Sequence, residues 1–255
     1  MATSKTLLRP LLRGGASTPS HHHHHLALLP SQRRTFLPNP FQSPLNPLNG
    51  ATSTPQTLTA TRTLPYASHP IYSIVADVQS YSHFLPYCQS SSVTQWSAPD
   101  PTYHRRWPSE ASLVIGFSNL TEHFTSRVFC VPGRIVESIG GSTETDLPRA
   151  DIAHHLEGAR DADKVGAKGA ATGLMTHLKS RWSIEQLSER STQVTLQLEF
   201  AFANPLYATL SAGAAPKVAE MMVRAFEERV GDLLGGDPEM ARAQLGDLEG
   251  SKVKR

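Results

Sequence analysis

The chain has 255 residues, 39% of them hydrophobic, and a formal net charge of +2. With 17 glycines added, this apolar content is ordinary for globular proteins and excludes a wholly disordered or collagen-like chain. No apolar run approaches the length of a membrane-spanning helix, so the sequence predicts none. The two cysteines, Cys88 and Cys130, lie far apart, which argues against a disulfide framework or a structural zinc site.

Positive charge is concentrated at the N-terminus. Residues 1–76 contain six basic residues and no Asp or Glu. This leaves 18 basic and 22 acidic residues for 77–255, a net charge of −4. A mildly acidic body lacks the positive surface by which proteins bind nucleic acids, so a nucleic-acid partner is not expected.

The first 36 residues have the composition of a mitochondrial transit peptide, rich in Arg and Ser and free of acids. Leucines between positions 7 and 12 recur at helical spacing, as in an amphipathic presequence. We predict cleavage just after Phe36 and assign no role to the histidines at 21–25. Residues 37–59 contain five prolines and are predicted to be a disordered linker.

The body of the chain begins with a predicted strand over 59–64, followed by short helices over 70–77 and 81–86. From 88 to 202 apolar and polar residues alternate, which is typical of an antiparallel sheet with one covered face. The clearest inward-facing set is Val194, Leu196, Leu198, Phe200 and Phe202. Along the inward-facing sets we expect no Asp, Glu or His.

Apolar residues return to helical spacing from Pro205 to about Leu234, which predicts a long amphipathic helix that covers the sheet. Pro216 is expected to kink or split this helix. Strands followed by such a helix predict an α+β fold. Residues 140–172, rich in Gly, Ala and Asp, are predicted to be a mostly disordered insertion in which His154 and His155 are solvated and bind no metal. Residues 235–255 are predicted to be a disordered tail.

Several short motifs occur in an order that resembles the mitochondrial coenzyme Q-binding START-domain proteins of the polyketide cyclase/START-like superfamily. They are 62–66 (RTLPY), 74–78 (IVADV), Tyr81, 84–88 (FLPYC), 111–117 (ASLVIGF), 178–182 (LKSRW), 198–202 (LEFAF) and 222–229 (MVRAFEER). The resemblance covers about 60–234 and implies a helix-grip fold, in which a curved antiparallel sheet wraps a long C-terminal helix around a lipid cavity. It also implies a non-catalytic ubiquinone-binding protein, at the matrix side of the mitochondrial inner membrane, that supports respiration and coenzyme Q biosynthesis.

Ubiquinone has a long isoprenoid tail, so its binding site needs an extended apolar cavity and few polar groups. No metal or cofactor is expected, since ubiquinone would be the bound ligand. The predicted cavity residues are the inward-facing apolar side chains: Leu113, Ile115, Phe117, Phe124, Val128, Leu178, Trp182, Leu196, Leu198, Phe200, Met222 and Phe226. The same side chains would also form an ordinary core.

Trp182 carries an indole N–H that needs an acceptor when buried, either a quinone carbonyl or a backbone carbonyl. On the opposite face His177, Lys179 and Arg181 form a basic stripe, which would either be solvated or contact anionic inner-membrane lipid. Respiratory-chain or quinone-synthesis enzymes are candidate protein partners. Two alternatives remain: a cyclase- or hydrolase-like enzyme of the same superfamily acting on a quinone precursor, and a protein acting on ribosome assembly.

Overall fold

Seven strands form one antiparallel sheet in the part of the chain that the computed structural model describes, residues 55–117, 120–157, 175–204 and 215–254. The strands lie in the order β1–β7–β6–β5–β4–β3–β2, so that β1 closes against β7 while β2 to β7 each pair with their neighbours in sequence. Their bounds are β1 Gln56–Leu64, β2 Cys88–Trp96, β3 Pro108–Phe117, β4 Leu120–Val131, β5 Ile135–Gly141, β6 Met175–Ser188 and β7 Ser191–Phe202. All described residues fall in one compact unit, 50–255.

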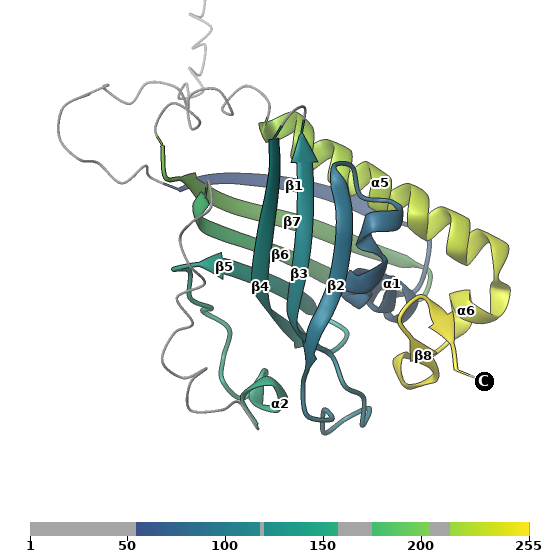
Figure 1. The fold of residues 1–255 in the computed structure, drawn as a ribbon. Helices are drawn as coiled ribbons and strands as arrows, with labels where there is room; N and C mark the ends of the chain where they lie inside the picture. Colours follow the sequence, from purple (N-terminus) through teal and green to yellow (C-terminus); the bar gives the residue numbers. More distant parts are fainter. Residues whose placement is uncertain (1–54, 118–119, 158–174, 205–214, 255) are drawn as a thin grey trace, which may run out of the picture. The chain divides into compact units, whose positions relative to one another are not determined.

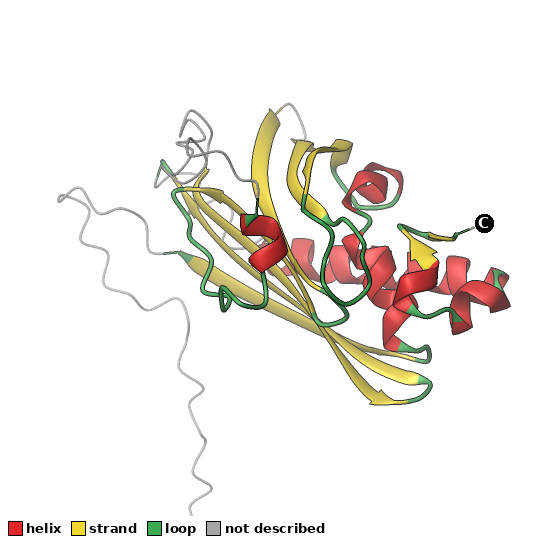
Figure 2. Cartoon of the chain, turned by 90° about the horizontal axis from the view of Figure 1, so that it is seen from below, coloured by secondary structure: helices red, strands yellow, loops and turns green. Residues whose placement is uncertain are grey.

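Helices cover one face of this sheet (Figures 1 and 2). The helix α1 (Ser68–Ala76) and the 3-10 helix η1 (Val78–His83) follow β1, close to the predicted positions. The long helix α5 (Ala215–Gly236) packs against the inner face of the sheet with Val223, Phe226 and Val230, each 2% exposed or less. Within the described residues, no helix is long and apolar enough to cross a membrane.

The alternation in the strands has the predicted consequence. Alternate side chains of a strand point to opposite faces, so one residue set of each strand reaches the helix. The main core accordingly joins Val128 of β4, Trp182 of β6 and Leu196 of β7 to Phe226 of α5. The α+β, helix-grip prediction is confirmed, with the curved sheet partly enclosing α5 (Figure 1).

One predicted boundary is wrong. The first strand begins at Gln56, so the last residues of the predicted linker belong to the sheet. Pro216 lies in the first turn of α5, a position that tolerates proline because the N–H groups there have no partner within the helix. The predicted kink or split concerns the residues before α5, which lie outside the described residues. The transit peptide, the rest of the linker and 205–214 lie outside the described residues.

The prediction of a disordered insertion at 140–172 is wrong for 142–157, which we call the outer strap. It contains the short helix α2 (Ala153–Leu156) and packs on the sheet face opposite α5 (Figure 2). Leu147 and Ile152 of the outer strap form a second core with Phe129 and Val131 of β4 and Ile139 of β5. Residues 158–174 lie outside the described residues.

The two histidines of the outer strap are buried, contrary to the expectation that they are solvated. His155 is 9% exposed; its Nε2 accepts from the backbone N–H of Cys130 at 2.8 Å, and its Nδ1 lies 2.7 Å from Ser109 Oγ. Burial, reinforced by the neighbouring His154, lowers the pKa of His155 to about 3, so its ring is neutral at physiological pH. His155 therefore ties the outer strap to β3 and β4.

The predicted disordered tail is also wrong for 237–254, which we call the C-terminal extension. It folds into α6 (Pro238–Arg242), the 3-10 helix η2 (Leu245–Asp247) and a hairpin of β8 (Leu248–Glu249) and β9 (Lys252–Val253). Asp237 caps α6 by accepting from the N–H groups of Glu239 and Met240. Met240, Leu245 and Leu248, each 2% exposed or less, join the main core.

Candidate functional site

The candidate site is the space between the inner face of the sheet and α5. Trp182 of β6 lies in register with Leu196 of β7 and with Val136 of β5, so its indole stands at the centre of the sheet. The ring packs against Phe226 of α5 with 4.9 Å between centroids. Sheet and helix are therefore in direct contact at this point.

The structure divides the predicted cavity residues into two zones. The first is closely packed; its residues are 6% exposed or less: Val128, Trp182, Leu196, Phe200 and Phe226. The second is half-buried and extends from the first toward the ends of β3 and β4: Leu113, Ile115, Phe124, Leu178, Leu198 and Met222. The Phe117 side chain lies outside the described residues.

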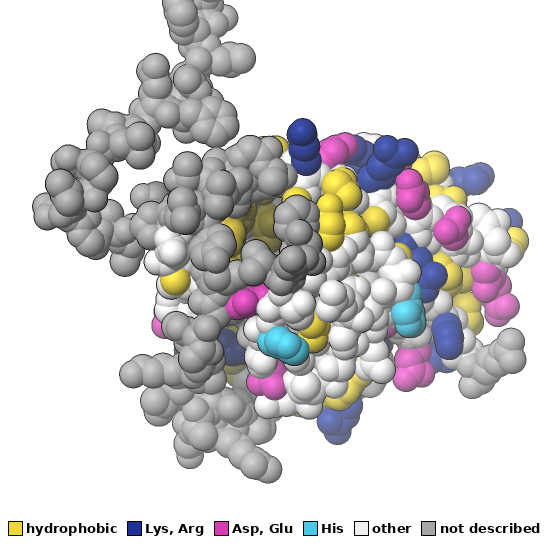
Figure 3. Space-filling view, turned by 45° about the horizontal axis from the view of Figure 1, so that its top comes forward, with side chains coloured by type: hydrophobic (Ala, Val, Ile, Leu, Met, Phe, Trp, Pro, Cys, Tyr) yellow, Lys and Arg dark blue, Asp and Glu magenta, His cyan; other side chains and the backbone are white. Residues whose placement is uncertain are grey.

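The half-buried zone is the part of the predicted site that is partly open to solvent. Its side chains come from β3, β4, β6, β7 and α5, and they are apolar yet partly open to solvent. Figure 3 shows hydrophobic side chains exposed in the upper part of the molecule. Apolar surface of this kind marks a binding region more often than scattered single residues do.

The expectation of no Asp, Glu or His on the inward faces is wrong at Glu122. Residues directly opposite in neighbouring strands share a face. Glu122 is opposite Ile115, as Phe124 is opposite Leu113. Glu122 therefore lies on the inner face, near the start of β4. The alternation from Phe124 back by two residues would have found it.

Arg62 is a second charged residue that the sequence analysis missed. It is opposite Val194 on the inner face of the edge strand β1, and it forms ion pairs with Glu220 and Glu227 of α5. Its side chain is 31% exposed, so solvent screens these pairs. Arg62 joins the edge of the sheet to the helix.

Residues 64–227 match the family described as polyketide cyclase / dehydrase and lipid transport. The chain belongs to this family. One curated relative is "Coenzyme Q-binding protein coq10, mitochondrial" of Schizosaccharomyces pombe, 31% identical over 67% of this chain and 84% of its own. Another is "Ribosome association toxin RatA" of Pseudomonas aeruginosa, 28% identical over 68% of this chain and 93% of its own. A START superfamily protein from Mycobacterium smegmatis, a solved structure, has 17% identity and a TM-score of 0.49 over 69% of this chain and 98% of its own.

Buried thiol and phenol groups beside the inner face of this family member are held in their neutral forms. Burial raises the pKa of Cys130 to about 12, so the thiol is protonated at neutral pH and is a poor nucleophile. Burial and the neighbouring Cys130 raise the pKa of Tyr72, whose hydroxyl donates to the backbone oxygen of Ile135. Burial also raises the pKa of Tyr81, which donates to the backbone oxygen of Val75 at 2.6 Å. These groups serve packing and hydrogen bonding.

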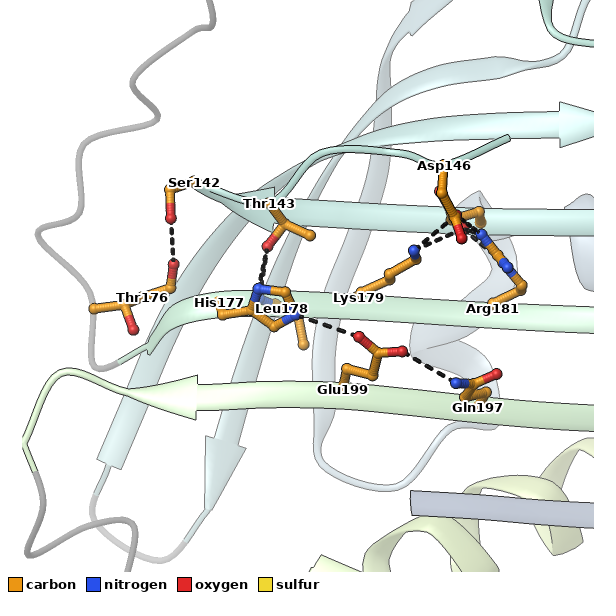
Figure 4. A network of polar contacts seen from close by, with 11 residues as sticks. Ser142, Thr143, Asp146, Thr176, His177, Leu178, Lys179, Arg181, Gln197 and Glu199 are labelled. Carbon is orange, nitrogen blue, oxygen red and sulfur yellow. Dashed lines mark hydrogen bonds and ion pairs between the residues drawn. The ribbon is translucent and has the colours of Figure 1, made fainter. Parts of the chain in front are cut away.

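The basic stripe on the outer face is not a solvated surface. Lys179 and Arg181 both pair with the fully buried Glu137 of β5. Both also pair with Asp146 of the outer strap (Figure 4). His177 lies 3.6 Å from Glu199 through its Nε2, and its Nδ1 lies 3.1 Å from Thr143 Oγ1. Because acids and the outer strap engage these side chains, the stripe does not form an open basic surface for anionic lipid.

No metal centre is evident in the ranges that the structure covers. No group of three or more His, Cys, Asp or Glu side chains there is arranged to hold an ion.

Proposed function

We propose that this protein is a non-catalytic ubiquinone-binding protein of mitochondria. In this proposal it is a lipid chaperone, peripheral to the matrix side of the inner membrane, that makes quinone available for respiratory electron transport and for coenzyme Q biosynthesis. The name of the Schizosaccharomyces pombe relative supports the ligand and the compartment. The acid-free N-terminus supports import and cleavage after Phe36.

The observation that carries the proposal is the apolar inner face, which is closely packed at Trp182 and half-buried toward Leu178 and Leu198. Each buried CH₂ contributes about 0.8 kcal/mol, so an isoprenoid tail gains free energy for every unit that it places against such a face. The half-buried zone offers this contact to the tail. Trp182, our candidate donor to a quinone carbonyl, lies in the closely packed zone, so the head group must displace packed side chains to reach it.

The test is organic extraction and mass spectrometry of the full-length protein purified from a quinone-producing host. Ubiquinone should co-purify with the wild-type protein. Leu198→Asn places a polar amide in the half-buried zone, and we expect about tenfold weaker binding or more, since an unpaired buried amide costs roughly 1–3 kcal/mol. Gln193→Asn is the matched control, because Gln193 lies on the same strand but on the outer parity.

The cellular role is tested by complementation. In cells that lack the native protein, Leu198→Asn should fail to restore respiration, and a short-tailed soluble quinone should partly restore it. Full rescue by a folded variant that binds no quinone would contradict the proposal.

A family enzyme acting on a quinone precursor is the second candidate, favoured by Glu122 on the inner face. A carboxylate there could act as an acid or a base. Turnover of a precursor by the purified protein, abolished in Glu122→Gln, would establish this reading and refute the non-catalytic one. The similarity to the ribosome association toxin adds one control, co-sedimentation with ribosomes, which we expect to be negative because 77–255 is acidic.

A further inference from the structure

A cavity lies away from the space between the sheet and α5. Its volume is about 460 Å³, within the range of small-molecule sites. It is bounded by the end of α1, by β2, by the loop 97–107 and by the C-terminal extension. Val78, Val93 and Pro108 give it an apolar side, and Trp96 stands in its wall with 52% of its surface exposed.

The buried carboxylate of Asp100 organises the loop in the cavity wall. Asp100 accepts from the backbone N–H groups of Thr102, Tyr103 and Arg105 and from Trp107 Nε1, at 2.7 to 3.1 Å. Burial alone would raise the pKa of Asp100, but these four donors outweigh it and lower the pKa. These four hydrogen bonds connect the two ends of the loop segment 100–107.

This loop presents two consecutive arginines to the cavity. Arg105 is half-buried with its guanidinium 4.2 Å above the Trp107 ring, and its one side-chain hydrogen bond in the described part of the chain goes to Ser73 Oγ. Arg106 is exposed, and within the described ranges its one side-chain hydrogen bond goes to the Ser97 backbone oxygen at 3.5 Å. Neither forms an ion pair with a carboxylate among the residues described. Burial lowers the pKa of Arg105, and the negative charges that oppose this effect include Glu249 and Asp77, which line the same cavity without forming an ion pair with it.

Two acids also line the cavity, and among the described residues neither forms an ion pair with Arg105 or Arg106. Asp77 accepts from Ser80 Oγ and from both the N–H and the hydroxyl of Ser251, which fixes the C-terminal extension to α1. Glu249 is exposed and lies opposite Lys252 in the β8–β9 hairpin. Lys254 contributes a third cation from the same extension.

The geometry points to a binding site for a phosphate ester in this cavity, with the phosphate at Arg105, Arg106 and Lys254 and the organic part against Trp96. Guanidinium groups bind phosphate oxygens through paired N–H donors. A cavity of this size exceeds a lone phosphate, and its apolar wall suits a carbon-containing ester. The ester belongs either to a soluble metabolite or to a phospholipid headgroup. The exposed Trp96 beside basic residues is compatible with the second source, because Trp and basic side chains favour a membrane surface. The inference does not depend on quinone as the ligand of the inner face.

The experiment uses the full-length protein and three probes: glycerol 3-phosphate by calorimetry, inorganic phosphate by calorimetry, and phosphatidylcholine vesicles with or without phosphatidylglycerol by co-sedimentation. Arg106→Gln and Trp96→Ala change exposed side chains and should leave thermal unfolding unchanged. We expect Arg106→Gln to weaken binding about tenfold or more, since hydrogen bonds to charged groups contribute roughly that factor. Trp96→Ala should also weaken binding, because it removes apolar contact with the organic part of the ester. Arg190→Gln removes an equally exposed arginine in the β6–β7 turn and is the control.

Binding of glycerol 3-phosphate that Arg106→Gln weakens and Arg190→Gln does not would support the site with a soluble ester. Binding confined to phosphatidylglycerol vesicles, with the same pattern, would support a headgroup site. The inference is overturned if no probe binds, if inorganic phosphate binds as tightly as the ester, or if Arg190→Gln weakens binding as much as Arg106→Gln. Quinone extraction from the same variants should be unaffected, which separates this test from that of the proposed function.

Discussion

The outer strap should contribute substantially to the stability of the domain, and Ile152→Ala tests this. Ile152 is 2% exposed and packs with Phe129, Val131 and Ile139. The substitution removes three carbon groups, roughly 2.4 kcal/mol of transfer free energy at about 0.8 kcal/mol each. The cavity left behind raises the expected loss in the free energy of unfolding to about 3–4 kcal/mol.

The assay is urea unfolding of the full-length protein, with the midpoint compared at an unchanged slope. Leu187→Ala is the control, because Leu187 is 52% exposed near the β6–β7 turn and should cost about 0.5 kcal/mol or less. Equal losses in the two variants would show that the strap is not packed on the sheet, and the second core would be refuted. The same packing predicts that a Gly/Ser linker in place of 142–157 destabilises the protein, which a disordered insertion would not do.

Three further predictions concern the strap and the C-terminal extension. Hydrogen bonds from Lys179 and Arg181 lower the pKa of Asp146 to about 2, so its contribution to stability is present above about pH 4 and is lost as the pH falls toward 2. Asp146→Asn should therefore reduce the fall in the free energy of unfolding at acid pH. The effect should be modest, because Asp146 is 65% exposed. His155 has a folded pKa of about 3, below its unfolded value near 6.5, so stability should fall as the pH drops from 6.5 toward 3, and His155→Gln should remove part of this slope. Asp237→Ala should cost about 0.5–2 kcal/mol in thermal or urea unfolding, since it removes the cap of α6.

Each of these has a matched control. Glu144→Gln changes an exposed acid of the same strap and should leave the fall at acid pH unaltered. His83→Gln, at an exposed histidine, should leave the slope below pH 6.5 as in the wild type. Asp237→Asn keeps a capping oxygen and should retain most of the stability that Asp237→Ala loses. A pH profile of Asp146→Asn or His155→Gln identical to the wild type would contradict the contacts of that residue.

For one of the two segments that were wrongly predicted to be disordered, the sequence contains evidence of packing. The outer strap resembles a disordered segment because Leu147 and Ile152 are isolated in a stretch without periodicity. However, Val128–Phe129–Cys130–Val131 is a continuous apolar run in β4, and such a run indicates a strand covered on both faces. The C-terminal extension has no comparable apolar run, and its buried residues Met240, Leu245 and Leu248 follow no helical or strand period.

The sequence alone determined the strands and helices in which apolar residues recur with the period of the backbone. The two-residue period of β7 and the helical spacing of α5 follow from local geometry, so the pattern of residues is enough to assign each apolar set to a face. Only the tertiary structure decided which faces are covered and which charges are paired. The burial of Ile152, the pairing of Glu137 with Arg181 and the cavity beside Arg105 join segments far apart in the chain. Such contacts depend on how the sheet curves and where the strap and extension return to it, and no local pattern encodes that.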